Sequence, residues 1–277
     1  MSARTAVVCL PVVCVLCACG ASEDPTTPVA ATGPPVSRDQ VDPASYDILF
    51  DFDQPVVPGD VVPGVTNVGT ARVNTTVVTA RGGALTWTPD RGNGWAVRAP
   101  VAAAEDEPVR AAAIVVWPDP SSLAGLDPGG RPVEMQVDFR ADPPAPSRPG
   151  DDGDNLVQWG RFGDPAQLKL QLDHGKPSCR AAGTAGEVFL AAEQPVEPER
   201  WYRLSCSVRP GEVRMRLTDL EGGAAPEEWV EEDDPGELRF GTVPMSIGAK
   251  VGAGGRLDKK SADQFNGTID RVVVDVR

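Results

Sequence analysis

The body of the chain contains two cysteines, Cys179 and Cys206, and each lies in a segment that predicts a β-strand. Exported proteins meet an oxidising environment, in which an even pair of thiols forms a disulfide. We therefore expect one disulfide between Cys179 and Cys206, and two buried free thiols are the alternative. No Cys-x-x-Cys pair or Cys/His cluster accompanies them, so the sequence does not predict a zinc site.

Paired carboxylates are the next group that could do chemistry. Retaining glycoside hydrolases place two carboxyl groups about 5 Å apart. Glu134 and Asp138 share one face of the predicted strand Val133–Phe139, but they lie about 13 Å apart at about 3.3 Å per residue. The chain also has no Glu-x-Asp-x-x-Glu run. A glycan-cleaving enzyme would therefore need carboxylates from different strands, and it stays an alternative to the function set out below.

The remaining polar candidates predict no catalytic centre. His174 is the only histidine and lies in a predicted turn. The run Asp151–Asn155 has the oxygen density that Ca²⁺ prefers, but it lacks the spacing of an EF-hand, and an acidic loop is the plainer interpretation. The acidic run Glu227–Asp234 predicts a solvated loop. A formal net charge of −14 repels phosphates, so nucleic acid is not an expected partner.

The first residues have the pattern of a targeting segment. Arg4 precedes the mostly apolar stretch Thr5–Leu16, which is too short to span a bilayer. Next comes Leu16-Cys17-Ala18-Cys19, which resembles a bacterial lipobox and implies cleavage before Cys19 and lipid attached to it. We therefore expect a signal peptide over residues 1–18, a lipid-anchored Pro-rich tether over 19–43, and a location on the extracytoplasmic face of a bacterial cell membrane. An ordinary secretion signal and an uncleaved anchor are the alternatives.

The elements that must position these residues are strands. Val133, Met135, Val137 and Phe139 alternate with polar residues, and so do the apolar residues of Tyr202–Leu217, which flank a Pro-Gly turn. From Tyr46 onward such signals recur and predict two packed antiparallel sheets. In the closing strand the apolar parity changes between Ile269 and Val272. Either both faces of this strand are covered, or a bulge near Ile269 and Asp270 resets the alternation.

Five segments resemble, in the same order, pieces of a laminin-G-like (concanavalin A-like lectin/glucanase) jelly roll: Leu49–Asp53, Val133–Phe139, Trp201–Leu204, Pro244–Gly248 and Phe265–Val274. The resemblance implies an all-β, two-sheet antiparallel jelly-roll sandwich over residues 44–277, with the first and last strands side by side. It also implies a ligand surface at the loop rim or on the concave face, often with Ca²⁺. If a structural Ca²⁺ lies near the paired ends, Asp53 and Asp270 are its expected ligands.

These observations together predict a binding module without catalytic activity. It would be attached to the membrane through its lipid alone and would recognise a glycan, a cell-wall polymer or a protein. Two alternatives remain: a divergent glycan-cleaving enzyme, and a structural envelope protein with no small ligand. Fold analogy contributes much of this ranking, and a fold alone does not define a function.

Overall fold

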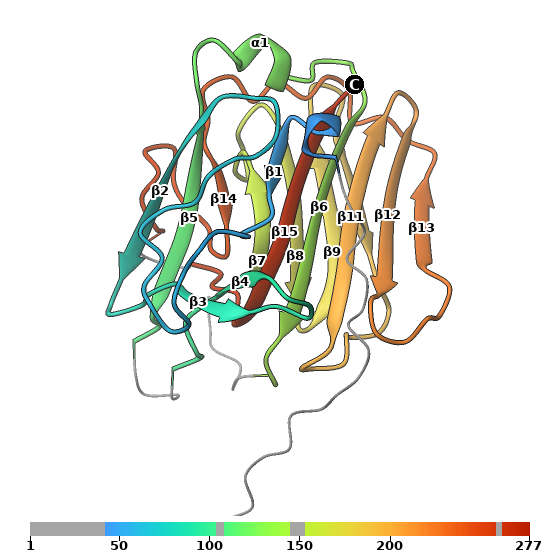
Figure 1. Cartoon of the computed structure of the whole chain (residues 1–277). Coiled ribbons are helices and arrows are strands. Elements are labelled where there is room, and N and C mark those ends of the chain that lie inside the picture. The colour runs from blue at the N-terminus through green and yellow to red at the C-terminus, as the bar shows by residue number, and fades with distance from the viewer. Residues whose placement is uncertain (1–41, 104–107, 145–152, 259–261) are drawn as a thin grey trace, which may run out of the picture. The chain divides into compact units, whose positions relative to one another are not determined.

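The structure is a computed structural model that describes residues 42–103, 108–144, 153–258 and 262–277. Cys19, the signal peptide, all but the last two residues of the tether, and Asp151 and Asp152 lie outside the described residues. The described part is a sandwich of two antiparallel sheets (Figure 1). The predicted fold class is therefore confirmed.

Within the described residues, sheet A has eight strands and sheet B has seven. The strands of sheet A are β1 (Ile48–Phe50), β3 (Thr86–Pro89), β4 (Trp95–Arg98), β6 (Val133–Ala141), β11 (Trp201–Arg209), β12 (Glu212–Asp219), β13 (Glu227–Glu231) and β15 (Gly267–Val276). Those of sheet B are β2 (Val73–Ala80), β5 (Ala111–Pro118), β7 (Gly153–Trp159), β8 (Gln167–Asp173), β9 (Lys176–Ala182), β10 (Glu187–Ala191) and β14 (Met245–Ile247).

The strand order explains how distant segments become neighbours. Sheet A runs β13-β12-β11-β6-β15-β4-β3, with β1 also pairing with β15, and sheet B runs β10-β9-β8-β7-β14-β5-β2. Phe50 of β1 lies opposite Val272 of β15, so the first and last strands are side by side, as the resemblance implied. Two short helices complete the described elements, η1 (Pro43–Ser45) and α1 (Leu123–Leu126). No described helix has the length and apolar character that a membrane span needs.

The core lies between the two sheets because alternate side chains of each strand point inward. Val133, Met135, Val137 and Phe139 of β6 are all buried in it. Aromatic side chains fill the centre: Trp159 stacks on Phe240 with ring centroids 4.4 Å apart. Cys179 of β9 and Cys206 of β11 form a disulfide across the core. This predicted bond therefore links sheet B directly to sheet A.

The closing strand β15 combines both possibilities that the sequence left open. Its pairing with β6 shifts register between Asp270 and Val272, so Arg271 is the extra residue of a β-bulge, with a positive φ of 24°. Most of its side chains on both faces are buried as well. A bulge of this kind lets Ile269 and Val272 both face the core although their sequence parity differs.

One sequence prediction about secondary structure is wrong. Glu227–Glu231, expected to be part of a solvated loop, forms the edge strand β13 and pairs with β12. Trp229 packs against the core from this strand, and β12 would otherwise leave its backbone groups without strand partners on that side. The three glutamates of β13 are exposed, which fits a charged edge that resists pairing with other chains.

Candidate binding face on the second sheet

The outer face of sheet B carries a row of polar side chains that crosses four strands. Lys169 lies opposite Gln158 of β7 on one side and opposite Arg180 of β9 on the other. Leu168 and Leu170, its neighbours in β8, are buried in the core. Since successive side chains of a strand alternate between faces, Lys169 points away from the core. Arg180 in turn lies opposite Phe189 of the edge strand β10.

Hydrogen bonds hold this row in place. The Arg180 guanidinium donates to Glu187 Oε1 at 2.6 Å and also to Gln167 Oε1. Gln158 Nε2 donates to the carbonyl of Gly160 at 2.7 Å, and Gln167 Nε2 donates to the same carbonyl at 3.3 Å. The side chains are thus fixed relative to one another before any ligand arrives, which lowers the entropy cost of binding.

An aromatic ring lies beside this network. Phe162, in the turn between β7 and β8, is 84% exposed. The Arg180 guanidinium carbon lies 4.8 Å from the centroid of its ring. One face of the ring is therefore backed by a cation, in a geometry that favours cation–π attraction.

Two lysines share a single carboxylate at the centre of the face. Asp263 Oδ2 lies 3.0 Å from Lys250 Nζ and 3.7 Å from Lys169 Nζ. The Lys169 side chain is only 12% exposed. Burial lowers the pKa of Lys169, Asp263 opposes this change, and the charges of Lys250 and Arg180 add to the lowering. Positive charge is thus concentrated here, although the chain as a whole is acidic.

Some hydrogen-bonding capacity on this face is unused. Gln158 is 3% exposed, and its Oε1 atom has no hydrogen-bond partner among the described residues. Ser178 of β9 is fully buried, and its Oγ atom also has none. Buried polar atoms without partners are rare in folded proteins and call for an explanation. We call Gln158, Gln167, Lys169, Arg180, Lys250, Asp263 and Phe162 the Lys169 face.

The Lys169 face could be predicted from the sequence only in part. The alternation of Leu168, Leu170 and Leu172 with polar residues already placed Lys169 on an outward face. Phe162, between Gly160 and Gly163, was an aromatic residue in a turn, which is a local signal that the prediction did not use. Asp263 and Lys250 come from segments far along the chain, so no local pattern could have joined them to Lys169.

Glu134 and Asp138, the two carboxylates that share one face of their strand, lie on the outer face of the other sheet. Asp138 is fully buried there. Its Oδ1 accepts from Arg203 Nε at 2.7 Å, and its Oδ2 accepts from Arg91 Nη2 at 3.2 Å. Two guanidinium groups therefore occupy the carboxylate and separate it from any substrate. Asp138 is a structural ion-pair residue in this arrangement, and the geometry does not favour it as a catalyst.

The two expected calcium ligands lie near the same end of the β1–β15 pairing. Asp53 is exposed, and its Oδ1 accepts from the Trp95 amide at 3.0 Å. Asp270 is buried, and its Oδ1 accepts from the Arg271 amide at 2.8 Å. It pairs with Asp138 across the strands, so two guanidinium groups lie close by and oppose a cation there.

The described residues contain no group of three or more His, Cys, Asp or Glu side chains placed to hold a metal ion. The calcium site stays a prediction. A calcium titration of the melting temperature against an EDTA control tests it, and an unchanged melting temperature contradicts it.

Comparisons with known proteins support the fold but do not assign the chain to a family. No protein-family model matches the chain, and no curated protein matches it in sequence. Among solved structures, domain 4 of AbnA, a GH43 extracellular arabinanase from Geobacillus stearothermophilus, in complex with arabinotriose, is 13% identical with a TM-score of 0.51, over 83% of this chain and 92% of that chain. The botulinum neurotoxin serotype G binding domain is 5% identical with a TM-score of 0.54, over 84% of this chain.

This chain spans 48% of the serotype G binding domain. The LG1-3 region of the laminin alpha2 chain is 15% identical with a TM-score of 0.42, over 53% of this chain and 29% of that chain. At these identities a likeness shows the fold alone, and the two matches with TM-scores above 0.5, the arabinanase and neurotoxin domains, carry that conclusion. The chain has the laminin-G-like, concanavalin A-like β-sandwich fold.

Proposed function

We propose that this domain is a non-catalytic binding module that recognises a glycan, with cell-wall polymers included in that class. The observation that carries the proposal is the Lys169 face, where charged and amide side chains held by hydrogen bonds lie beside an exposed aromatic ring. The arabinanase domain of similar fold, which was solved with arabinotriose, supports a sugar as the ligand.

The chemistry of the face suits a chain of sugar rings. Each ring presents hydroxyl groups that both donate and accept hydrogen bonds, together with faces of C–H groups. Lys169 and Arg180 can donate hydrogen bonds to sugar hydroxyls, and Asp263 can accept them. The exposed side of the Phe162 ring offers an apolar surface on which the C–H groups can pack. Polar groups that fix orientation beside an apolar contact surface are typical of small-ligand sites.

The experiment measures binding of soluble polysaccharides by affinity electrophoresis and isothermal titration calorimetry. Phe162→Ala should weaken binding at least tenfold, because it removes the apolar contact, while its melting temperature stays unchanged. Val57→Ala is the matched control, since Val57 is also exposed (61%) and apolar but lies away from sheet B. Full binding by Phe162→Ala would show that the Lys169 face is not the site. Binding to a protein array, with no polysaccharide bound above background, would favour a protein ligand instead.

We also propose that a lipid on Cys19 holds the domain on the extracytoplasmic face of a bacterial cell membrane. The lipobox-like run Leu16–Cys19 and the Pro-rich stretch that follows it support this location. Two or more acyl chains give stable attachment, whereas one does not. Cys19→Ala should move the protein from the membrane fraction to the soluble fraction. Equal membrane attachment of the variant would overturn the proposal.

A further inference from the structure

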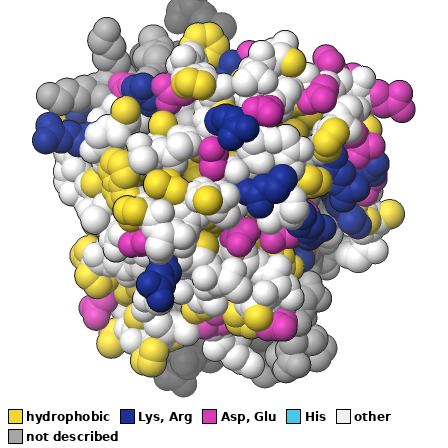
Figure 2. Space-filling model, turned by 90° about the horizontal axis from the view of Figure 1, so that it is seen from above, with side chains coloured by type: hydrophobic (Ala, Val, Ile, Leu, Met, Phe, Trp, Pro, Cys, Tyr) yellow, Lys and Arg dark blue, Asp and Glu magenta, His cyan; other side chains and the backbone are white. Residues whose placement is uncertain are grey.

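A groove separate from the Lys169 face lies at the end of the sandwich that carries α1 and the C-terminus (Figure 1). The last residue of β11, Arg209, lies at this end. The turn between β11 and β12, the loop after α1 and the segment before Phe240 meet there. Figure 2 looks onto this end of the molecule, where basic and acidic side chains are interspersed rather than collected in separate patches.

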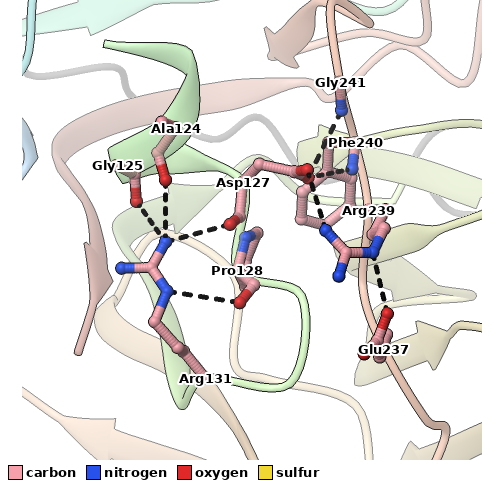
Figure 3. Close-up of polar contacts among 9 residues, drawn as sticks. All are labelled: Ala124, Gly125, Asp127, Pro128, Arg131, Glu237, Arg239, Phe240 and Gly241. Carbon is pink, nitrogen blue, oxygen red and sulfur yellow. Dashed lines mark hydrogen bonds and ion pairs between the residues drawn. The ribbon is translucent and has the colours of Figure 1, made fainter.

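The loop after α1 is locked in place (Figure 3). One guanidinium nitrogen of Arg131 donates to the carbonyls of Ala124, Gly125 and Asp127 at 3.2, 2.7 and 2.9 Å. These carbonyls end α1, where a cation is favourable because they lack helical partners. This wall of the groove is therefore rigid, and the protein engages Nε and one of the two terminal nitrogens of Arg131.

The opposite wall is fixed to that loop. Asp127 Oδ1 accepts from the Phe240 amide at 2.7 Å, and its other oxygen lies 3.8 Å from the Arg239 guanidinium (Figure 3). Gly129 and Leu238 exchange two backbone hydrogen bonds of 2.9 and 2.8 Å. A ligand would therefore meet a preformed groove and would pay little to order it.

Two pockets adjoin in this groove, and Arg209 lines both of them. One has a volume of about 160 Å³ and is bounded by Gly129, Gly236 and Leu238. The other has a volume of about 280 Å³ and is bounded by Glu134, Ser207 and Asp275. Together they approach the size of a small-ligand site, which is roughly 300 Å³ or more. We call these two pockets, with Arg209 between them, the rim groove.

Arg209 differs from the other charged groups of the rim groove. Arg277 pairs with Asp275 and Glu134, and Glu237 pairs with Arg239. Asp234, an exposed residue, accepts a hydrogen bond from the Gly236 amide. In the part of the chain that the structure describes, the exposed Arg209 guanidinium has no hydrogen-bond or ion-pair partner. Its five donors remain available in a fork that matches a carboxylate.

The geometry points to the rim groove as a second subsite for the glycan, specific for an acidic sugar unit whose carboxylate Arg209 binds through two parallel hydrogen bonds. This inference rests on the proposed glycan-binding function. Bidentate pairing of guanidinium and carboxylate gives both strength and orientation. Ser207 and Asp234 supply further polar groups for the hydroxyls of the same ring. A neutral sugar would leave the guanidinium without its partner.

The experiment uses the whole chain and a panel of uronate oligosaccharides, namely galacturonate, glucuronate and mannuronate oligomers, each beside its methyl ester. Calorimetry should show at least one acid bound at least tenfold more tightly than its ester by the unmodified protein. Arg209→Ala should abolish that preference. Arg140→Ala is the matched control, because Arg140 is also exposed but lies at the opposite end of β6, and it should keep the preference.

The outcomes separate this inference from the proposed function. Equal affinity for acid and ester throughout the panel, or an unchanged preference in Arg209→Ala, overturns the rim groove as an acidic subsite. If neutral polysaccharides still bind and Phe162→Ala still weakens them, the proposed function survives that result. If no polysaccharide of either kind binds, both proposals fall together.

Discussion

The outer faces of the two sheets each bury a group of charged side chains, and the two groups are built differently. On sheet A, the carboxylate of Asp138 is fully buried and is matched by Arg203 and Arg91. On sheet B, Lys169 and Lys250 share the single carboxylate of Asp263. Within the part of the chain that the structure describes, Gln158 Oε1 on sheet B has no hydrogen-bond partner. The carboxylate of the first group is matched by two guanidinium groups, whereas in the second group two lysines depend on one carboxylate.

The difference comes from what covers each face. Arg91 belongs to the loop between β3 and β4. This loop is held in shape by Asp90 Oδ1, which accepts from the Gly92 and Gly94 amides at 2.7 and 3.0 Å. The loop thus places the Arg91 guanidinium beside Asp138 and covers that part of the outer face of sheet A. Phe162, in the turn between β7 and β8, is 84% exposed. The part of the Lys169 face next to Phe162 is therefore open to solvent. Similar residue types are therefore fully paired under the β3–β4 loop, whereas on sheet B they lie beside an exposed aromatic ring.

The largest expected effect is a loss of stability on replacing Asp138 in sheet A, and it tests whether the two charged groups differ as described. Asp138→Ala leaves two partly buried guanidinium groups without their carboxylate, so the free energy of unfolding should fall by about 3–5 kcal/mol. Urea denaturation followed by tryptophan fluorescence measures it. Glu134→Ala, on the same face of β6 but partly exposed, is the control and should cost about 0.5 kcal/mol or less. Equal losses in the two variants would show that Asp138 has no special structural role.

The disulfide joins the two sheets, so its removal tests how much this link contributes to the stability of the sandwich on which both faces lie. The double variant Cys179→Ala, Cys206→Ala opens a loop with a sequence separation of 27 residues. Chain-entropy arguments predict a loss of about 3 kcal/mol in the free energy of unfolding. Thermal denaturation should show a lower melting temperature, and polysaccharide affinity below that temperature should be unchanged. A melting temperature that stays the same in the double variant would contradict a stabilising role for the bond.

The smallest effect is expected for Lys169, in the way the free energy of unfolding changes with pH. Burial lowers the pKa of Lys169 in the folded protein from its usual value of 10.5. Between the lowered pKa and 10.5 the unfolded chain binds more protons than the folded chain does, so stability rises with pH in that window. Lys169→Met removes this rise, whereas Lys176→Met, at an exposed lysine, should keep it.

Denaturant unfolding of the three proteins at a series of pH values up to about 10.5 measures the dependence on Lys169. The unmodified protein should gain stability relative to Lys169→Met as the pH increases. A difference between these two proteins that is constant with pH would mean that Lys169 titrates in the same way in the folded and unfolded chains. The Lys169 face would then lack the buried positive charge that distinguishes it from the Asp138 group.

Much of the fold could be predicted because its signals are local. The alternation in Val133–Phe139 predicted which side chains of β6 enter the core, and the Pro-Gly turn after Arg209 predicted the hairpin, in which Arg209 lies opposite Glu212. The prediction failed at Glu227–Glu231, where acidic residues outnumber apolar ones. Pairing with β12 and the packing of Trp229 determine the structure there. Long-range pairing overrides local preference in such edge strands.

The amino-acid sequence by itself determined most of the strands, which face of those strands is apolar, and the pair of cysteines available to link the layers. It did so because side chains alternate along a strand with a period of two residues, which any single segment displays. Only the tertiary structure decided that Lys169 meets Asp263, that Arg91 closes over Asp138, and that Arg209 stands between two pockets. These neighbours come from distant segments, and strand order and register bring them together.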